Sequence, residues 1–532
     1  MSYKKYIKTL MLSVLGAASL CLVACGAGEE ISQGDTQVSE NAEGDTNEYT
    51  SRDLDWSYEE VTEEITLSDE TGSVTITKEG VYLISGSLSN GQVIVDCEDD
   101  DAKVQLVLSG VSINTENAAA IYVKNADKVF LTLEEGTDNV LSTSGAFVAD
   151  GDINVDGVVF AKSDLTINGE GSLSITSTDN GIVSKDILRV VSGSLSISAQ
   201  GHGLSGKDSL RVCGGVIEIT CQEDALHGSG DESDATLGNV SITGGSFTIY
   251  AGDDGIHAES DLTIANASID ILSSYEGLEG FTVTINSGDI RIVASDDGIN
   301  AAGGNDGSSD SWMAGGSSFN GNPFDGNDAY VITINGGELY ICAGGDGIDS
   351  NGLLYLNGGT VYVDGPSDGA NAAVDFGTTA YVNGGTLIAV GNSAMAENFS
   401  EDSEAAAILY TTSANQAAGT QITLLDSDGN ELLTFTSAKS FNCVQLSCDA
   451  LEVGQTYTLV VGEEEASIEL TSNIYGSGNG FGGMHGGGMQ GGGMPSGDMP
   501  DGEMPSGDMP GGDMPGGDMP GGPENRQDGT QP

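Results

Sequence analysis

GNVSITGGSFTIYAGDDGIHAE (residues 238–259) is repeated as FTVTINSGDIRIVASDDGINAAG (281–303) and as YVITINGGELYICAGGDGIDSNG (330–352). In each copy an acidic residue precedes a glycine, and this slot recurs at steps of 21 or 22 residues, with steps of 30 and 49 where insertions intervene. The slot residues are Asn180, His202, Asp224, Asp254, Glu276, Asp297, Asp346 and Asp368. A fixed period interrupted by insertions predicts a solenoid.

Each repeat contains two short runs in which apolar and polar residues alternate, separated by a glycine turn. One example is Ile332-Thr333-Ile334, then Asn335-Gly336-Gly337, then Leu339-Tyr340-Ile341. A period of two is the pattern of strands, so the sequence predicts an all-β fold in which each repeat is one coil of a parallel β-helix. Successive coils would lie about 4.8 Å apart, so residues of the same slot would stack. Asn286, Asn335, Asn357 and Asn383 are predicted to form one such ladder at a corner.

Composition divides the chain into five segments. Three lysines and an apolar run too short to span a membrane precede Leu22-Val23-Ala24-Cys25, which resembles a bacterial lipobox at the end of a signal peptide. We expect Cys25 to carry lipid, which would make the protein an extracellular lipoprotein anchored to the cell membrane; an ordinary cleaved signal peptide is the alternative. The predicted segments are a signal peptide (1–25), an acidic disordered tether (26–53), the parallel β-helix (54–398), a small C-terminal β module (399–475) and a disordered tail rich in Gly, Met, Pro and Asp (476–532).

The predicted C-terminal module has longer strands than the repeats. Asp428-Gly429 lies between the runs ITLLD and ELLTF and is typical of a hairpin turn. A solenoid must protect the open edge of its last coil, and we expect this module to cover it.

The charge of the chain limits its partners. The formal net charge is −65, with 16 Lys and Arg against 81 Asp and Glu. Nucleic acid and anionic lipid surfaces are therefore excluded as partners, whereas cations are favoured. We expect a monomer that contacts a membrane only through its N-terminal lipid.

Stacking of the repeats would bring carboxylates together at one outer corner. Two carboxylates 4.8 Å apart repel by about 3 kcal/mol at an effective dielectric constant near 20. Protonation, a splayed and solvated arrangement, or a bound cation would offset this cost.

Calcium takes six to eight oxygen ligands and fits between two coils. The candidate calcium ligands are Asp253, Asp254, Glu276, Glu279, Asp296, Asp297, Asn300, Asp346, Asp349, Asp368 and Asn371. Acidic turn residues that only solvate a corner are the alternative, and His202, His227 and His257 leave a zinc option.

One outward column near the predicted metal ligands suits a glycan. Arg291 is the one lysine or arginine between Arg211 and Lys439, and Tyr340 and Tyr362 follow it in the same position of later coils. Tyrosine rings stack on sugar faces, and a guanidinium pairs with a uronate or with hydroxyls. Trp312, in the Gly-rich insertion, is a further candidate for this surface.

Several ordered motifs resemble a known family. They include AAIYVKNADKVFLTLEEGTDN, AKSDLTINGEGSLSI, GDDGIHAESDLTI, SYEGLEG and GDGIDSNG. Over about residues 54–475 the chain resembles the calcium-binding β-helix family of bacterial carbohydrate-binding domains found largely in clostridia. The resemblance implies a right-handed parallel β-helix similar to family nine polysaccharide lyases, with calcium along the coils. It also implies binding of cellulose-like and acidic plant polysaccharides without known catalysis. Asn180 and His202 depart from the acidic slot, so calcium is not expected in those first coils.

Together these observations predict a surface-anchored, calcium-dependent protein that binds polysaccharides, such as polygalacturonate or cellulose, without catalysis. Two other functions remain open. A calcium-stabilised stalk or adhesin would need only the acidic columns. A polysaccharide lyase would need a base beside calcium, and Arg291 is the candidate for that role.

Overall fold

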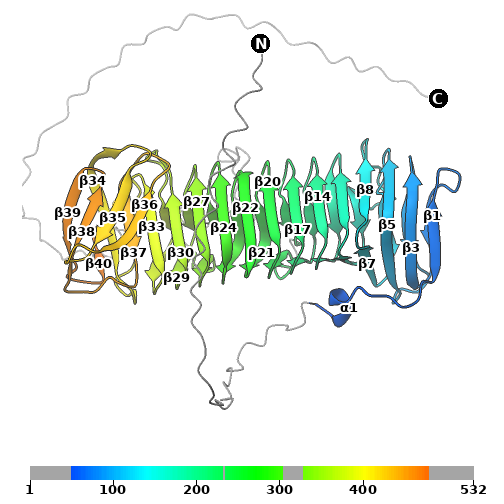
Figure 1. The fold of residues 1–532 in the computed structure, drawn as a ribbon, viewed down its shortest axis with the longest axis horizontal. Coiled ribbons are helices and arrows are strands. Elements are labelled where there is room, and N and C mark those ends of the chain that lie inside the picture. Colours follow the sequence, from blue (N-terminus) through cyan, green and yellow to red (C-terminus); the bar gives the residue numbers. More distant parts are fainter. Residues whose placement is uncertain (1–48, 232–233, 303–326, 479–532) are drawn as a thin grey trace, which may run out of the picture.

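The computed structural model describes residues 49–231, 234–302 and 327–478. Cys25 with the predicted signal peptide, most of the tether, Trp312 and almost all of the tail lie outside these residues. The described chain is nearly all β with one four-residue helix, which confirms the predicted all-β class. None of its helices is long and apolar enough to cross a membrane. Figure 1 shows an elongated stack of strands that starts at β1 and ends in a compact group of strands.

The strands of the stack lie in three rows, and within each row every strand pairs in parallel with the strand of the next repeat. The first row contains β1 (Glu63–Leu67), β3 (Gly80–Leu88), β5 (Lys103–Thr115), β7 (Lys128–Leu133), β10 (Asp164–Gly169), β13 (Ile187–Val190), β16 (Ser209–Val212), β19 (Asn239–Ile242), β21 (Ile256–Ile264), β23 (Leu278–Ile285), β26 (Val331–Ile334), β29 (Leu353–Leu356) and β32 (Thr379–Val382).

The second row contains the ends of β3 and β5, then β8 (Asp138–Thr143), β11 (Ser172–Thr176), β14 (Ser194–Ser198), β17 (Val216–Thr220), β20 (Ser246–Tyr250), β22 (Ala267–Ser274), β24 (Gly288–Ala294), β27 (Glu338–Ala343), β30 (Thr360–Asp364) and β33 (Thr386–Gly391). The third row contains β2 (Val74–Ile76), β4 (Val93–Asp96), β6 (Ile121–Asn125), β9 (Gly157–Ala161), β12 (Asn180–Ser184), β15 (Leu204–Gly206), β18 (Leu226–Gly228), the beginnings of β21 and β23, β25 (Ile299–Ala301), β28 (Ile348–Ser350) and β31 (Val374–Phe376). A repeat therefore contributes one strand to each row, and we call it a coil.

Alternation within each strand fills the interior of the stack. In β24, Ile290 and Ile292 are buried while Arg291 between them is exposed. They pair in register with Leu339 and Ile341 of the next coil. Because every second residue points inward at the same level, apolar side chains stack into continuous columns through the core.

The asparagine ladder lies at the corner between the first and second rows. Asn335 donates from Nδ2 to Asn286 Oδ1 at 2.9 Å, Asn357 donates to Asn335 at 2.9 Å, and Asn383 donates to Asn357 at 2.8 Å. Each amide accepts from one coil and donates to another, so the predicted corner ladder is confirmed.

A short helix, α1 (Ser51–Leu54), holds the N-terminal segment against the first row. Asp53 is fully buried, and its Oδ1 lies 2.7 Å from Lys128 Nζ and accepts from Thr166 Oγ1 at 2.6 Å. Burial alone raises the pKa of Asp53, but its hydrogen bonds with Lys128, Thr166 and Thr50 outweigh this and lower the pKa to about 2. The predicted disordered tether over residues 26–53 is therefore wrong at its end, because its last residues are part of the fold.

The C-terminal strands cover the open edge of the second row, as predicted. They are β34 (Ala407–Gln416), β35 (Gln421–Leu425), β36 (Glu431–Thr436), β37 (Phe441–Ser447), β38 (Thr456–Val461), β39 (Glu464–Glu469) and β40 (Ile474–Tyr475). Strand β37 pairs antiparallel with β33 and with β34, and a separate antiparallel sheet has the order β36-β35-β38-β39. Asp428-Gly429 forms the turn between β35 and β36, where Gly429 has a φ of 83°. The module packs on the last coils at one end of the stack (Figure 1).

Candidate metal-binding columns

The backbone aligns the slot residues one above another at the turn that leads into the third row. Gly277 N donates to Asp297 O at 3.0 Å, Gly298 N to Asp346 O at 2.9 Å, and the same bond recurs between the other coils. The residues aligned in this way, which we call the slot column, are Asn180, His202, Asp224, Asp254, Glu276, Asp297, Asp346 and Ala372. The sequence alignment of the slots is thus confirmed up to Asp346.

Most slot side chains accept a hydrogen bond from the slot residue of the next coil. Asp224 Oδ1 accepts from Asp254 N at 3.0 Å, and Asp254 Oδ1 accepts from Glu276 N at 3.2 Å. Asp297 Oδ1 accepts in the same way from Asp346 N at 2.6 Å. Each carboxylate thus satisfies a backbone donor that the turn leaves without a strand partner, which offsets part of the repulsion along the column.

A second column lies three residues later, in the strands of the third row. The register of these strands aligns Ser205, His227, His257, Glu279, Asn300, Asp349 and Asp375, which we call the strand column. Asp375 was not identified from the sequence.

The last coil departs from the predicted alignment. Its turn is longer, so that Ala372, 26 residues after Asp346, donates its N–H to Asp346 Oδ1. Asp375, rather than the predicted Asn371, pairs with Asp349. Asp368 is exposed, and its Oδ1 accepts from Ala370 N at 2.9 Å within its own turn. The predictions that Asp368 and Asn371 extend the two columns are therefore wrong.

The first acidic cluster joins two coils at Asp254, Glu276 and Glu279. Each residue offers a carboxylate oxygen within 4.8 Å of the other two, and all three side chains are buried. Asn300 Nδ2 donates to both oxygens of Glu276, at 3.1 and 3.0 Å. Its own Oδ1, together with Glu279 Oε1, is buried without a hydrogen-bond partner. Buried oxygens without partners are costly, and a cation between the coils would satisfy them.

The electrostatics of this cluster also favour a cation. Burial, followed by the charges of Glu279, Asp254 and Asp297, raises the pKa of Glu276 to about 10. Burial raises the pKa of Glu279 to about 7, although His257 opposes this shift. His257 Nδ1 lies 2.5 Å from Glu279 Oε2 and 3.0 Å from Asp254 Oδ2. One imidazole therefore compensates only part of the negative charge.

The second acidic cluster contains Asp297, Asp346 and Asp349, whose carboxylate oxygens also lie within 4.8 Å of one another. Burial, followed by the charge of Asp349, raises the pKa of Asp346 to about 9. The pKa of Asp349 is raised well above its usual range by burial and by Asp297 and Asp375. The cluster thus has more carboxyl groups than it can keep ionised without a cation.

Asp253 and Asp296, the predicted additional ligands, lie one residue before their slot residues and are half-buried. Asp253 O accepts from Tyr275 N at 2.7 Å, and Asp296 O accepts from Gly345 N at 2.9 Å. They flank the two clusters without joining either group of converging oxygens.

The predicted glycan column is aligned as expected, but part of it is covered. Arg291, Tyr340 and Tyr362 lie in register on β24, β27 and β30, and the Arg291 guanidinium is 4.5 Å from the centre of the Tyr340 ring. Tyr340 donates its hydroxyl to Asp364 Oδ2 at 2.8 Å. The Tyr362 ring stacks on Phe435 of the C-terminal module, with centres 5.4 Å apart, so the module occupies a ring face that was predicted to bind sugar.

A second outward aromatic pair was not identified from the sequence. Tyr355 and Tyr381 lie in register on β29 and β32, with ring centres 5.3 Å apart and planes within 9° of parallel. Both side chains are half-exposed. Their common position in LLYL and TAYV, one coil apart, is the signal that could have found them.

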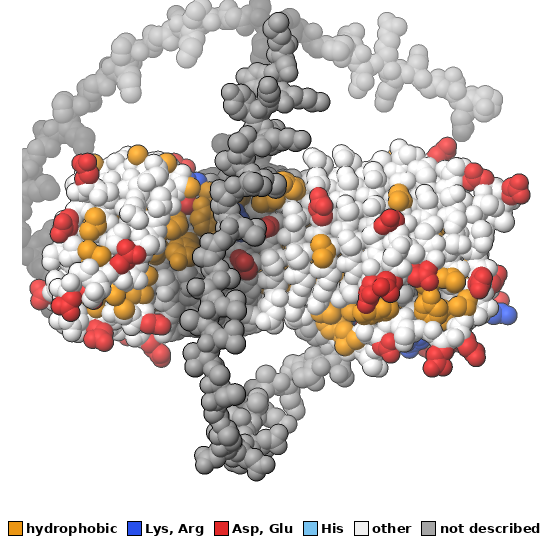
Figure 2. Space-filling view, in the orientation of Figure 1, with side chains coloured by type: hydrophobic (Ala, Val, Ile, Leu, Met, Phe, Trp, Pro, Cys, Tyr) orange, Lys and Arg blue, Asp and Glu red, His pale blue; other side chains and the backbone are white. Residues whose placement is uncertain are grey.

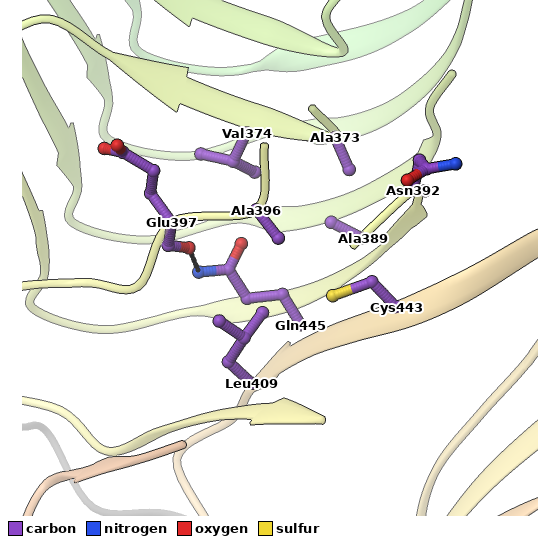
Figure 3. A pocket seen from close by; sticks show the side chains of 10 residues that line it. Ala373, Val374, Ala389, Asn392, Ala396, Glu397, Leu409, Cys443 and Gln445 are labelled. Atoms are coloured by element: carbon purple, nitrogen blue, oxygen red, sulfur yellow. Dashed lines mark hydrogen bonds between the residues drawn. The ribbon is translucent and has the colours of Figure 1, made fainter. Parts of the chain in front are cut away.

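The remaining surface and cavities add little to the site. Figure 2 shows acidic side chains scattered over the visible face, with few basic ones. A small pocket at the junction with the C-terminal module is lined by Ala373, Val374, Ala389, Gly391, Asn392, Ala396, Glu397, Leu409, Cys443 and Gln445 (Figure 3). Gln445 donates to Glu397 O across it at 3.2 Å. None of these lining residues belongs to either column.

Comparison with known proteins supports a carbohydrate-related family. Residues 70–318 match the family described as carbohydrate-binding domain-containing protein. A carbohydrate-binding domain-containing protein of Acetivibrio thermocellus is 33% identical over 187 residues, which are 35% of this chain and 63% of that protein. The match therefore spans less than two thirds of the relative. A solved structure described as a polysaccharide lyase-like protein from C. thermocellum, gadolinium derivative, shares 32% identity over 44% of this chain and 88% of its own, with a TM-score of 0.35.

Proposed function

We propose that this protein is a calcium-dependent, non-catalytic polysaccharide-binding protein, displayed outside the cell and anchored through lipid on Cys25. The observation that carries the proposal is the pair of acidic clusters, and in the first of them buried oxygens of Glu279 and Asn300 lack partners. The match of residues 70–318 to carbohydrate-binding domains supports the class of ligand.

Two groups of residues would hold calcium. Asp254, Glu276, Glu279 and Asn300 provide one set of oxygen donors, and Asp297, Asp346, Asp349 and Asp375 provide the other. Calcium accepts such oxygen-rich sets and tolerates irregular geometry, whereas magnesium requires a tighter octahedron. When bound, the ion would neutralise the columns and offer remaining coordination positions to a sugar carboxylate or hydroxyl.

Two surfaces would contact the glycan. Arg291, held over the Tyr340 ring, can pair with a uronate carboxylate. The parallel rings of Tyr355 and Tyr381 offer a flat face to a neutral pyranose. Acidic glycans would therefore depend on calcium and Arg291, and cellulosic glycans on the tyrosine pair.

We also infer that the stack is a right-handed parallel β-helix. Parallel pairing of every strand with its counterpart one coil later supports the helical arrangement. The right-handed preference of parallel crossovers supports the hand.

Sedimentation of the full chain with polygalacturonate or with cellulose, with and without calcium, tests the function. Glu276→Gln and Arg291→Ala should each weaken polygalacturonate binding, while Tyr355→Ala combined with Tyr381→Ala should weaken cellulose binding. Asp368→Asn, which removes an exposed charge outside both columns, is the matched control and should bind like the wild type.

Each alternative function has its own result in this experiment. Release of unsaturated uronate products, detected by their ultraviolet absorbance, would show that the protein is a lyase rather than a binding protein. If calcium stabilises the protein but the protein binds neither polymer, the result supports a surface stalk. Full polygalacturonate binding by folded, calcium-free protein would overturn the proposed role of the ion.

A further inference from the structure

Histidines replace acids at the N-terminal end of the two columns. His202 is in the slot column, and His227 lies one coil later in the strand column. Their rings are 4.1 Å apart between centres, and Asp224 lies beside both. Each of the three residues offers a ligand atom within 4.8 Å of the other two. This group contains two nitrogen donors and one oxygen donor, unlike the acidic clusters.

The donor atoms of this group converge on one carboxylate oxygen. Asp224 Oδ2 is 3.2 Å from His202 Nδ1 and 4.0 Å from His227 Nδ1. His227 Nδ1 is buried without a hydrogen-bond partner. The other carboxylate oxygen of Asp224 already accepts from Asp254 N, so Oδ2 is the atom that remains for a ligand.

Two neighbouring groups contact the nitrogens of His202. Glu223 Oε2 lies 3.1 Å from Nε2, so Nδ1 is the nitrogen that faces Asp224. The Asp224 amide N–H donates to the same Nδ1 at 3.2 Å, so a bound metal would replace this hydrogen bond.

We propose that His202, Asp224 and His227 form a binding site for a divalent first-row transition metal, with zinc as the first candidate. Zinc binds nitrogen and carboxylate oxygen at about 2.0 to 2.2 Å, which puts tetrahedral donors about 3.3 Å apart. The separation of 3.2 Å between Asp224 Oδ2 and His202 Nδ1 already matches this value, and the separation of 4.0 Å to His227 Nδ1 needs a contraction of about 0.7 Å. Calcium, which prefers six to eight oxygens, is disfavoured by two imidazoles.

The surroundings also resemble those of a metal site. In many metal sites a carboxylate accepts a hydrogen bond from the ring nitrogen of a ligating histidine that does not bind the metal. Glu223 lies in this position beside His202 Nε2. The side chains of His202 and His227 are 20% and 18% exposed, so water can reach a fourth coordination position. His257 is excluded from the set because Asp254 and Glu279 already hold its Nδ1.

The competing explanation is a protonated His202 that pairs with both carboxylates and binds no metal. Zinc titration of the purified full chain in excess calcium separates the two explanations. Excess calcium fills the acidic clusters first, so the result does not depend on the proposed polysaccharide binding. Isothermal titration calorimetry gives the affinity and stoichiometry, and X-ray absorption identifies the ligands of the bound zinc.

The coils themselves provide variants that keep the fold. His202→Asn copies Asn180, whose Oδ1 accepts the N–H of the next slot residue at 2.7 Å. His227→Ser copies Ser205, the preceding residue of the strand column. His485→Asn removes the fourth histidine of the chain and serves as the control.

We expect one zinc ion per chain with imidazole ligands, and a loss of affinity of at least about a hundredfold in His202→Asn and in His227→Ser. His485→Asn should bind like the wild type. Circular dichroism and an unchanged calcium stoichiometry show that each variant is folded. Zinc affinity that is unchanged in the two folded variants, zinc that calcium displaces completely, or a spectrum without imidazole would overturn the site.

Discussion

Calcium binding should release protons, because the proposed ligands hold protons when no cation is present. In the metal-free fold the pKa of Glu276 is about 10 and that of Asp346 about 9, mainly because both groups are buried. At pH 7 both carboxyl groups are therefore almost fully protonated. Calcium binds the ionised form, so each of the two sites should release at least about one proton on binding, and Glu279 and Asp349, whose pKa values are also raised, add to this number.

The direction of the pH dependence follows from these raised pKa values. Between the ordinary pKa of Glu276, 4.5, and the folded value of about 10, the metal-free fold holds a proton that the unfolded chain has lost. The contribution of Glu276 to the stability of the metal-free protein is thus greatest below pH 4.5 and falls as the pH rises toward 10. Ionising Glu276 at pH 7 costs about 4 kcal/mol, since one pKa unit corresponds to about 1.4 kcal/mol. Over the same window calcium affinity should increase by about tenfold per pH unit for each proton that a site releases.

Calorimetry in two buffers with different ionisation enthalpies measures the protons released. We expect at least about two protons per chain at pH 7 and a calcium dissociation constant that falls by about a hundredfold for each released proton between pH 6 and pH 8. Glu276→Gln should leave one site and only the protons released there. A dissociation constant that is equal at pH 6 and pH 8, with no proton released, would refute the assignment of these buried carboxyl groups as ligands.

Three other substitutions test separate parts of the structure. Asp53→Ala leaves the Lys128 ammonium buried without its nearest partner and should destabilise the N-terminal end by about 3 kcal/mol, measured as earlier proteolysis at α1. Asn335→Leu removes two ladder hydrogen bonds and should cost about 2 kcal/mol in urea unfolding without changing calcium content. Asp297→Asn should weaken calcium at one site, while Asp368→Asn should not change the stoichiometry measured by elemental analysis.

The repeat made most of the columns predictable from the sequence. In most coils the slot residue at the turn into the third row carries an acceptor, because its side chain receives the next slot N–H. The slot prediction was wrong in the last coil. There Asp368-Gly369 has the sequence of the motif but lies in a longer, exposed turn. Ala372 fills the slot there, and only the hydrogen-bond register reveals it.

Contacts between distant segments could not be predicted from local patterns. Tyr362 has the alternation of an outward strand residue, yet Phe435 of a separate sheet covers its ring. Asp53 lies in a polar stretch typical of a disordered tether, yet Lys128 and Thr166 bury it. In both cases the partner lies more than 70 residues away, and no period connects the two positions.

The slot column also shows which of its properties the fold requires. Asn180 accepts the next slot N–H at 2.7 Å without any charge, so an uncharged acceptor is sufficient for the turn. Asp254, Asp297 and Asp346 make the same kind of bond but add carboxyl groups, and two neighbouring carboxyl groups of the column repel by about 3 kcal/mol when both are ionised. Since the turn does not need these charges, their accumulation in the later coils favours a role in binding cations. The slot residues of the first coils, Asn180 and His202, are not acidic, and at that end of the columns imidazole groups take the place of carboxylates as possible metal ligands.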